Sequence, residues 1–116
     1  MGEEVTFKTE ELIAGDITTD VVTLTEGKYY RGMPVVFDDT SGKWSEAEIE
    51  EGAPLAIYLG NGIDNPRTIT ADSFDTIIKA GGLYEGGIVD DDGAPVAFTE
   101  QKIEILRANG IFVKRK

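Results

Sequence analysis

Short apolar runs rich in β-branched and aromatic residues recur along much of the chain, and many of them are followed by glycine or aspartate. Runs at residues 21–25 and 29–30 are closed by Glu26-Gly27 and by Gly32. The next run, Pro34–Phe37, ends in a polar cluster at residues 38–42 that is typical of a tight turn. The pattern therefore predicts strands from about residue 18, with 34–37 and 43–45 paired as a hairpin.

The second half of the chain continues this pattern less regularly. Residues 46–51 carry few apolar side chains and are predicted to be a surface connection, whereas 53–59 is the clearest buried strand, with Pro54 near its beginning. Phe74, Ile77 and Ile78 fit one helical face, but the β-branched residues at 76–78 favour a strand, which we predict for 74–80. The remaining segments are predicted to be a short strand at 67–70, a bend at 81–87, and two short strands at 88–89 and 95–98.

The pattern changes to a helical period near the end of the chain. Thr99 is a predicted N-cap, Glu100 lies in the first turn, and Gly110 supplies a left-handed stop. A short helix is predicted between them, followed by a strand. Its Lys102 and Arg107 are predicted to point outward. The residues predicted to belong to the core of this unit, or to fix its turn, are Ile103, Leu106, Gly110, Ile111 and Phe112.

Together these elements predict a mostly β protein with one short C-terminal α-helix, an α+β fold in one compact domain over residues 15–116. A length of 116 residues is enough for one real core. Residues 1–14 hold little to bury and are predicted to be a flexible N-terminal arm. Within the arm, Val5, Thr6, Phe7 and Lys8 alternate at period two, which fits either strand addition to another chain or an ordinary frayed terminus.

Composition narrows the classes of function. The chain carries 22 Asp and Glu against 11 Lys and Arg, a net charge of −11, so nucleic acid is a poor partner. Without cysteine or histidine it cannot form disulfides, zinc sites built on those residues or the usual catalytic bases. No signal peptide and no apolar run long enough for a bilayer is visible, so export by that route and a membrane partner are not expected.

Motifs that resemble catalytic or ligand sites are weak. Gly60-Asn61-Gly62 lacks the spacing of a dinucleotide fingerprint, and the carboxylates at 46–51 show no spacing that singles out a pair. The sequence Asp90-Asp91-Asp92-Gly93 favours a turn over a cation loop. We therefore predict no enzyme activity, no metal and no cofactor. Four aromatic residues favour core or subunit contacts, with a sugar-binding platform as the alternative: Tyr29, Tyr30, Trp44 and Tyr58.

Several segments follow one another in a distinctive order: Gly15-Asp16 with 21–27, then 30–35, then 52–57, and finally the ending Leu-Arg-x-x-Gly-Ile at 106–111. From about residue 15 to the end, this order resembles the lambda-type head decoration proteins of tailed bacteriophages. The resemblance implies a compact, barrel-like or β-tulip-like subunit. It further implies a homotrimer on the outside of the expanded capsid, at threefold and quasi-threefold positions, which stabilises the virion against the pressure of packaged DNA.

The resemblance also implies where binding occurs. The arm would add a strand to a sheet of the major capsid protein through Val5, Thr6, Phe7 and Lys8, with Leu12 and Ile13 as anchors. Lys114, Arg115 and Lys116 form a basic end that is either a solvated tail or a contact with an acidic partner such as the capsid. The protein would be made in the host cytoplasm and found in the virion. The alternative function is an outward-facing β module that binds glycans or cell surfaces.

Overall fold

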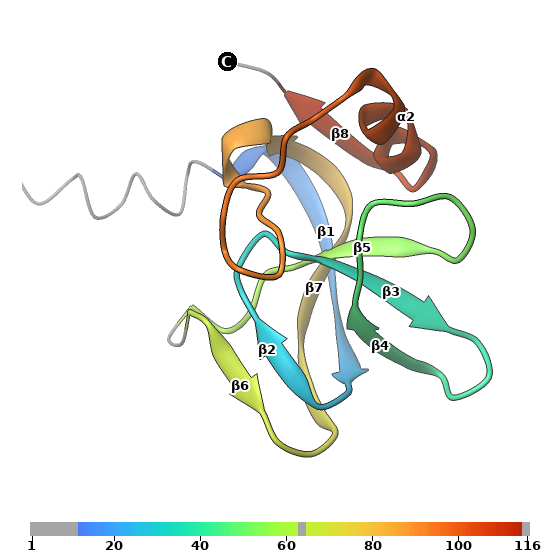
Figure 1. Ribbon diagram of the computed structural model, residues 1–116, viewed down its shortest axis with the longest axis vertical. Coiled ribbons are helices and arrows are strands. Elements are labelled where there is room, and N and C mark those ends of the chain that lie inside the picture. Colours follow the sequence, from blue (N-terminus) through green and yellow to red (C-terminus); the bar gives the residue numbers. More distant parts are fainter. Residues whose placement is uncertain (1–11, 63–64, 115–116) are drawn as a thin grey trace, which may run out of the picture.

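The computed structural model describes residues 12–62 and 65–114. Strands dominate, and one α-helix lies near the C-terminal end (Figure 1). The elements in chain order are β1 (Ile13–Leu24), β2 (Gly27–Tyr29), β3 (Pro34–Asp38), β4 (Lys43–Glu46), β5 (Leu55–Tyr58), β6 (Arg67–Ile69), β7 (Ser73–Tyr84), a 3₁₀ turn (Glu85–Gly87), α2 (Glu100–Ala108) and β8 (Ile111–Lys114). The mostly β fold with a short C-terminal helix is confirmed.

Six strands form one sheet in the order β1-β4-β3-β5-β7-β8, and β1 also pairs with β7. The pairings thus return from β7 to β1 and form a ring of five strands, while β2 and β6 form a separate pair beside it (Figure 1). The ring closes through a short parallel contact in which Leu24 lies opposite Trp44. The predicted hairpin is the antiparallel pair β3–β4.

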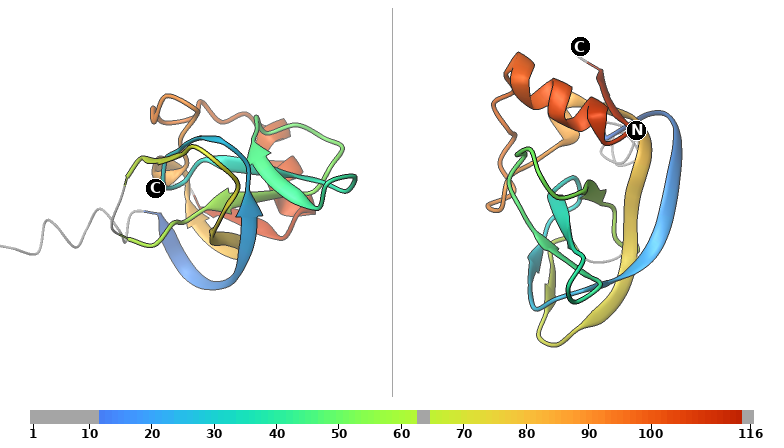
Figure 2. Two further views of the ribbon diagram at one scale, coloured as in Figure 1. Left: turned by 90° about the horizontal axis from the view of Figure 1, so that it is seen from below. Right: turned by 90° about the vertical axis from the view of Figure 1, so that its right-hand side faces the viewer.

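The long strands β1 and β7 form a curved antiparallel ribbon that spans the molecule (Figure 2). Two predictions were wrong here: the first strand begins at Ile13 and not near residue 18, and Gly81-Gly82 lies within β7, where a bend over 81–87 is predicted. The register shifts between Ile13 and Ile17, so β1 absorbs its extra residues as a bulge. A Cβ on Gly81 would lie 2.3 Å from the carbonyl oxygen of Asp16, so glycine there permits close approach of the two backbones.

The central strands bury side chains on both faces. On β5, Leu55 and Ile57 face one cluster and Ala56 and Tyr58 face the other, because successive side chains of a strand point to opposite sides. The first core lies beneath α2 and contains Leu12, Ile49, Leu55, Ile57, Ile78, Leu83, Ile88, Ile105, Leu106 and Ile111. The second core lies inside the ring and contains Leu24, Tyr29, Met33, Val35, Trp44, Ala56, Tyr58, Ile69 and Ile77.

Helix α2 has the predicted beginning and end. The Lys102 amide donates a hydrogen bond to the Thr99 hydroxyl oxygen at 3.3 Å, and Gly110 adopts φ +86° after the last turn. Asn109, which the sequence did not single out, accepts from the Leu55 amide and donates to the Ile105 carbonyl, both at 2.8 Å. The helix end is thereby tied to β5.

The predicted core of the C-terminal unit is correct except at one position. Ile103, Leu106 and Ile111 are buried, whereas Phe112 is 56% exposed. The prediction for Phe112 was wrong because neighbouring side chains of a strand point to opposite sides. In β8 the Phe112 side chain therefore points away from the core that Ile111 enters.

Candidate functional site

The strands that begin and end the described chain meet on β7 at one end of the molecule. Leu83 of β7 lies opposite Ile13 of β1 on one side and Val113 of β8 on the other. The Tyr84 amide donates to the Leu12 carbonyl at 2.8 Å, and Leu12 is 2% exposed. The chain therefore enters and leaves this domain at the same end (Figures 1 and 2).

This geometry corrects the predicted boundary of the arm. Leu12 belongs to the first core and Ile13 begins β1, so these two residues anchor the domain itself and are not available as anchors on a partner. Val5, Thr6, Phe7 and Lys8, for which we predict strand addition, lie outside the described residues. An arm that binds another protein therefore ends before Leu12.

The C-terminal side of this end carries basic and apolar groups. Lys114 is the exposed last residue of β8, while Arg115 and Lys116 lie outside the described residues. In the described part of the chain β8 pairs only with β7, so its outer edge has no strand beside it. Phe112 adds an exposed ring to this edge. Open strand edges pair readily with other chains, so this one can take part in an interface.

The aromatic residues do not form a surface platform. Tyr29 and Tyr58 are 0% and 1% exposed, and their ring centroids lie 5.5 Å apart in the second core. Trp44 is buried in the same core and packs on Phe37 with centroids 5.3 Å apart. Tyr30 is partly buried against this core. The sugar-platform interpretation of these rings is wrong, and their role in the core is confirmed.

The Asp75 carboxylate accepts hydrogen bonds from three groups. Its Oδ2 accepts from the Tyr58 hydroxyl at 2.7 Å and from Arg67 Nη1 at 2.6 Å, and its Oδ1 accepts from the Thr76 amide at 2.8 Å. Burial acts to raise the pKa of Asp75, but these hydrogen bonds and the Arg67 charge outweigh it and leave the pKa below its usual value. Burial and the hydrogen bond to Asp75 raise the pKa of Tyr58.

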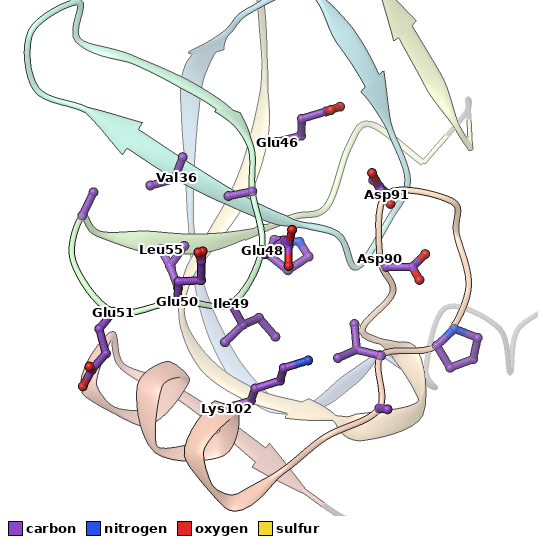
Figure 3. A pocket seen from close by; sticks show the side chains of 16 residues that line it. Val36, Glu46, Glu48, Ile49, Glu50, Glu51, Leu55, Asp90, Asp91 and Lys102 are labelled. Atoms are coloured by element: carbon purple, nitrogen blue, oxygen red, sulfur yellow. The ribbon is translucent and has the colours of Figure 1, made fainter.

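A cavity of about 870 Å³ lies between the segment 46–53, the segment 90–97 and the first turns of α2. Its floor is apolar, since Val36, Ile49, Leu55 and Val96 belong to the first core or pack against it. Its rim carries carboxylates on both sides, with Lys102 extending into the space from α2 (Figure 3). We call this site the acidic groove; its six acidic residues are Glu46, Glu48, Glu50, Glu51, Asp90 and Asp91.

The segment 46–51 thus differs in part from its prediction as a plain surface connection. Its glutamates are exposed, but Ile49 is 6% exposed and packs into the first core. Ile49 holds the segment against the domain, and the acidic side chains around it therefore stay along one wall of the groove. A single isoleucine among acidic residues is too weak a sequence signal to predict a groove.

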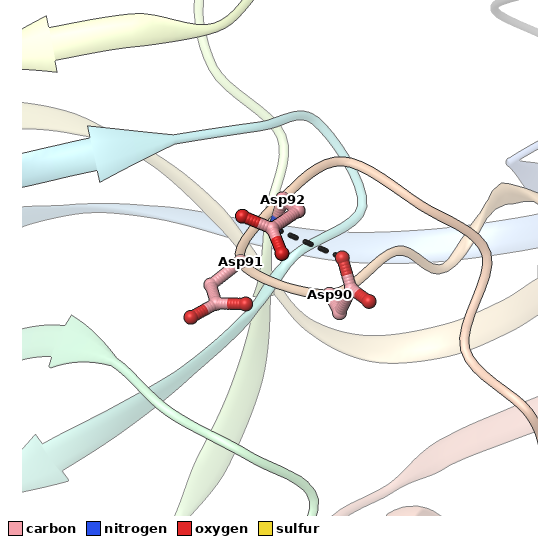
Figure 4. A group of neighbouring side chains, drawn as sticks. All are labelled: Asp90, Asp91 and Asp92. Atoms are coloured by element: carbon pink, nitrogen blue, oxygen red, sulfur yellow. Dashed lines mark hydrogen bonds between the residues drawn. The ribbon is translucent and has the colours of Figure 1, made fainter.

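The aspartates at 90–92 form the predicted turn. Oδ1 of Asp90 accepts from the amides of Asp92 and Ala94 at 2.9 and 3.0 Å, which fixes the turn (Figure 4). One oxygen of each carboxylate lies within 4.8 Å of the others. Asp91 and Asp92 are exposed, and the hydrogen bonds of Asp90 account for its position without an ion.

A scan of protein-family models and a search of curated proteins each found no match to this chain. In residues 12–62 and 65–114, no helix is long and apolar enough to cross a membrane. What can be argued about function therefore comes from the residues and geometry described above.

Proposed function

We propose that this protein is a capsid decoration subunit of a tailed phage, which binds the outer surface of the expanded capsid as a trimer at threefold and quasi-threefold sites. The proposal is carried by one observation: Ile13, Leu83 and Val113 lie side by side at one end of the molecule. The first and the last described strand both reach this end of the body. The resemblance of residues 15–116 to head decoration proteins supplies the identity of the partner surface.

The proposed mechanism is non-covalent adhesion, in which no reaction is catalysed. Val5–Lys8 of the arm add a strand to an open sheet edge of the major capsid protein, where backbone hydrogen bonds supply affinity. Ordering an extended arm costs part of that binding free energy. Three arms on one trimer compensate, because the binding of one arm raises the effective concentration of the other two. The subunit bodies then clamp neighbouring capsomers.

The alternative function, glycan binding by an outward-facing module, has less support. Glycan binding would use exposed rings of Trp44 and the three tyrosines, but three of those four rings are buried. The acidic groove is lined by carboxylates and aliphatic side chains and presents no aromatic ring. Stacking on a sugar face therefore has no site in this groove.

Deleting residues 2–11 tests the proposal. We expect the truncated protein to keep the melting temperature and the oligomeric state of the full chain, because the deletion stops before Leu12 of the first core. We expect it to lose binding to expanded capsids of the phage that encodes it, measured by co-sedimentation. Full occupancy of capsids by the truncated protein would rule out the arm as the binding element.

Two further variants separate loss of the arm from loss of the fold. Phe7→Pro removes one backbone donor from the predicted strand, whereas Glu3→Pro makes the same chemical change outside it. We expect Phe7→Pro to weaken capsid binding and Glu3→Pro to retain it. Deleting residues 2–13 also removes the buried Leu12. This variant should therefore lose about 2–5 kcal/mol of unfolding free energy and melt at a lower temperature.

A further inference from the structure

We propose that the acidic groove binds the C-terminal segment, residues 112–116, of a neighbouring copy of this chain. The inference rests on the proposed homotrimer and names the contact that holds it together. In this arrangement each subunit gives its basic end to one neighbour and receives the basic end of the other.

The groove offers an apolar floor to an inserted side chain. Ile49 and Leu55 are buried in the first core, with Val36 and Val96 packed against it, and together they line a cavity of about 870 Å³. A space of this size is in the range that accepts one or two large side chains. An apolar side chain that enters it is removed from water on several sides, which favours binding.

The rim of the groove carries negative charge that the subunit itself leaves largely unbalanced. Six carboxylates and one lysine line it. Within the described ranges none of those six carboxylates forms a salt bridge. Like charges gathered around a low-dielectric floor repel one another and attract a cationic segment. The groove therefore fits an occupant with an apolar side chain followed closely by several positive charges.

The chain itself contains one segment of that chemistry. Lys114, Arg115 and Lys116 are consecutive, and no two of the other lysines and arginines are adjacent in the sequence. Two residues earlier, Phe112 is 56% exposed on the edge strand β8. Phe112 would fill the apolar floor and the three cations would lie along the acidic rim. The groove and the segment match in charge, and each combines an apolar group with several charged groups.

A subunit cannot place its own Phe112 in its own groove. β8 is held in register with β7, with Phe112 opposite Gly82, and its Ile111 side chain enters the first core. That core also forms the floor of the groove, through Ile49 and Leu55. Phe112 points to the opposite side of β8 and therefore away from the groove, so a second copy has to supply the ring.

Such a contact joins two different surfaces and is therefore heterologous. A heterologous contact that repeats with a rotation of one third of a turn closes into a ring of three, in which each groove and each basic end is occupied. The contact leaves residues 2–11 free for the capsid. It also makes the trimer sensitive to salt, because its charges lie at an exposed rim.

Reciprocal charge reversal tests the inference. The first variant carries Lys114→Glu, Arg115→Glu and Lys116→Glu, the second carries Glu48→Lys, Glu50→Lys and Glu51→Lys, and the third carries both sets on one chain. The control carries Asp16→Lys, Glu26→Lys and Asp39→Lys, which reverse three exposed carboxylates away from the groove. Sedimentation velocity in low and high salt gives the mass of each, and thermal unfolding verifies that each is folded.

We expect each groove or tail variant alone to weaken trimer formation by at least about tenfold. A chain carrying both sets should trimerise again, because the charges are complementary once more, and the control should remain a trimer. Phe112→Ser should weaken the trimer without charge reversal. Trimers that persist in both single sets, or a wild-type protein that stays monomeric at micromolar concentration, would overturn the inference.

An intramolecular tail contact has a different signature and would also overturn the inference: charge reversal would then lower the melting temperature without changing the mass. Co-sedimentation of the wild-type chain with capsids separates this inference from the proposed function. A charge-dependent trimer that ignores capsids would refute capsid decoration and keep the groove contact. A capsid-binding trimer that ignores both charge sets would refute only the groove contact.

Discussion

Asp75 is the one charged residue that is buried among those the structure describes, with 6% of its surface exposed. Burying a carboxylate is costly unless donors replace water, and here Tyr58, Arg67 and the Thr76 amide do so. Arg67 comes from β6, Tyr58 from β5 and Asp75 from β7. One carboxylate thus connects the small β2–β6 pair to the ring of strands.

This network makes stability dependent on pH. Because the pKa of Asp75 is lower in the folded than in the unfolded protein, its contribution is complete above the unfolded value of about 4 and is lost as the pH falls through the folded value. Asp75→Asn should cost about 1.5–3 kcal/mol at pH 7. Urea unfolding at pH 7 and at pH 3 should show a smaller difference between variant and wild type at pH 3. An unchanged difference would contradict this role for the carboxylate.

At the scale of elements, β8 shows that neighbouring side chains of one strand can differ strongly in burial. Ile111 is 0% exposed and Phe112 is 56% exposed, although the two are adjacent and both apolar. Ile111→Ala should cost about 2–5 kcal/mol, whereas Phe112→Ala should change the unfolding free energy of the subunit by less than about 0.5 kcal/mol. Chemical unfolding of a dissociated subunit measures both. Equal losses would show that Phe112 is packed.

The same scale shows which elements the sequence predicts. The hairpin at 34–46 and helix α2 follow from local signals, namely the turn residues 38–42, the Thr99 cap and Gly110. The long ribbon does not, because β1 and β7 pair across about 50 residues and no local pattern encodes their register. Gly81 begins the bend predicted at 81–87, but in the structure it pairs with Ile17, where the register of this ribbon shifts.

The candidate functional residues could likewise be predicted from the sequence only where local signals determine their positions. Ile103 and Leu106 are buried as the sequence predicts, because burial in a helix follows its period, and Thr99 caps the helix. Ile105 is buried as well, although it is not among the predicted core residues. Leu12 was assigned to the arm, since only the fold reveals that the Tyr84 amide binds its carbonyl. The acidic groove combines segments 46–53 and 90–97 with α2, so charge alone could not locate it.

At the scale of the whole molecule, the two cores share β3, β5 and β7 and should unfold together. Trp44, the only tryptophan, lies in the second core, while α2 packs on the first. Tryptophan fluorescence and the helical circular dichroism signal should therefore give coincident urea transitions. Separate midpoints would mean that α2 and β8 form an independent unit.

The position of β7 among its neighbours also bears on how the protein reaches its fold. β7 pairs with β1, β5 and β8, and its contacts with β1 close loops of about 50 to 70 residues. Closing such loops costs chain entropy before any contact forms, so proteins dominated by distant pairings fold in milliseconds to seconds and not in microseconds. Until residues 73–84 have been synthesised, β1 has no antiparallel partner, and the apolar Val22 and Leu24, which pack in the folded protein, stay exposed to aggregation in the nascent chain.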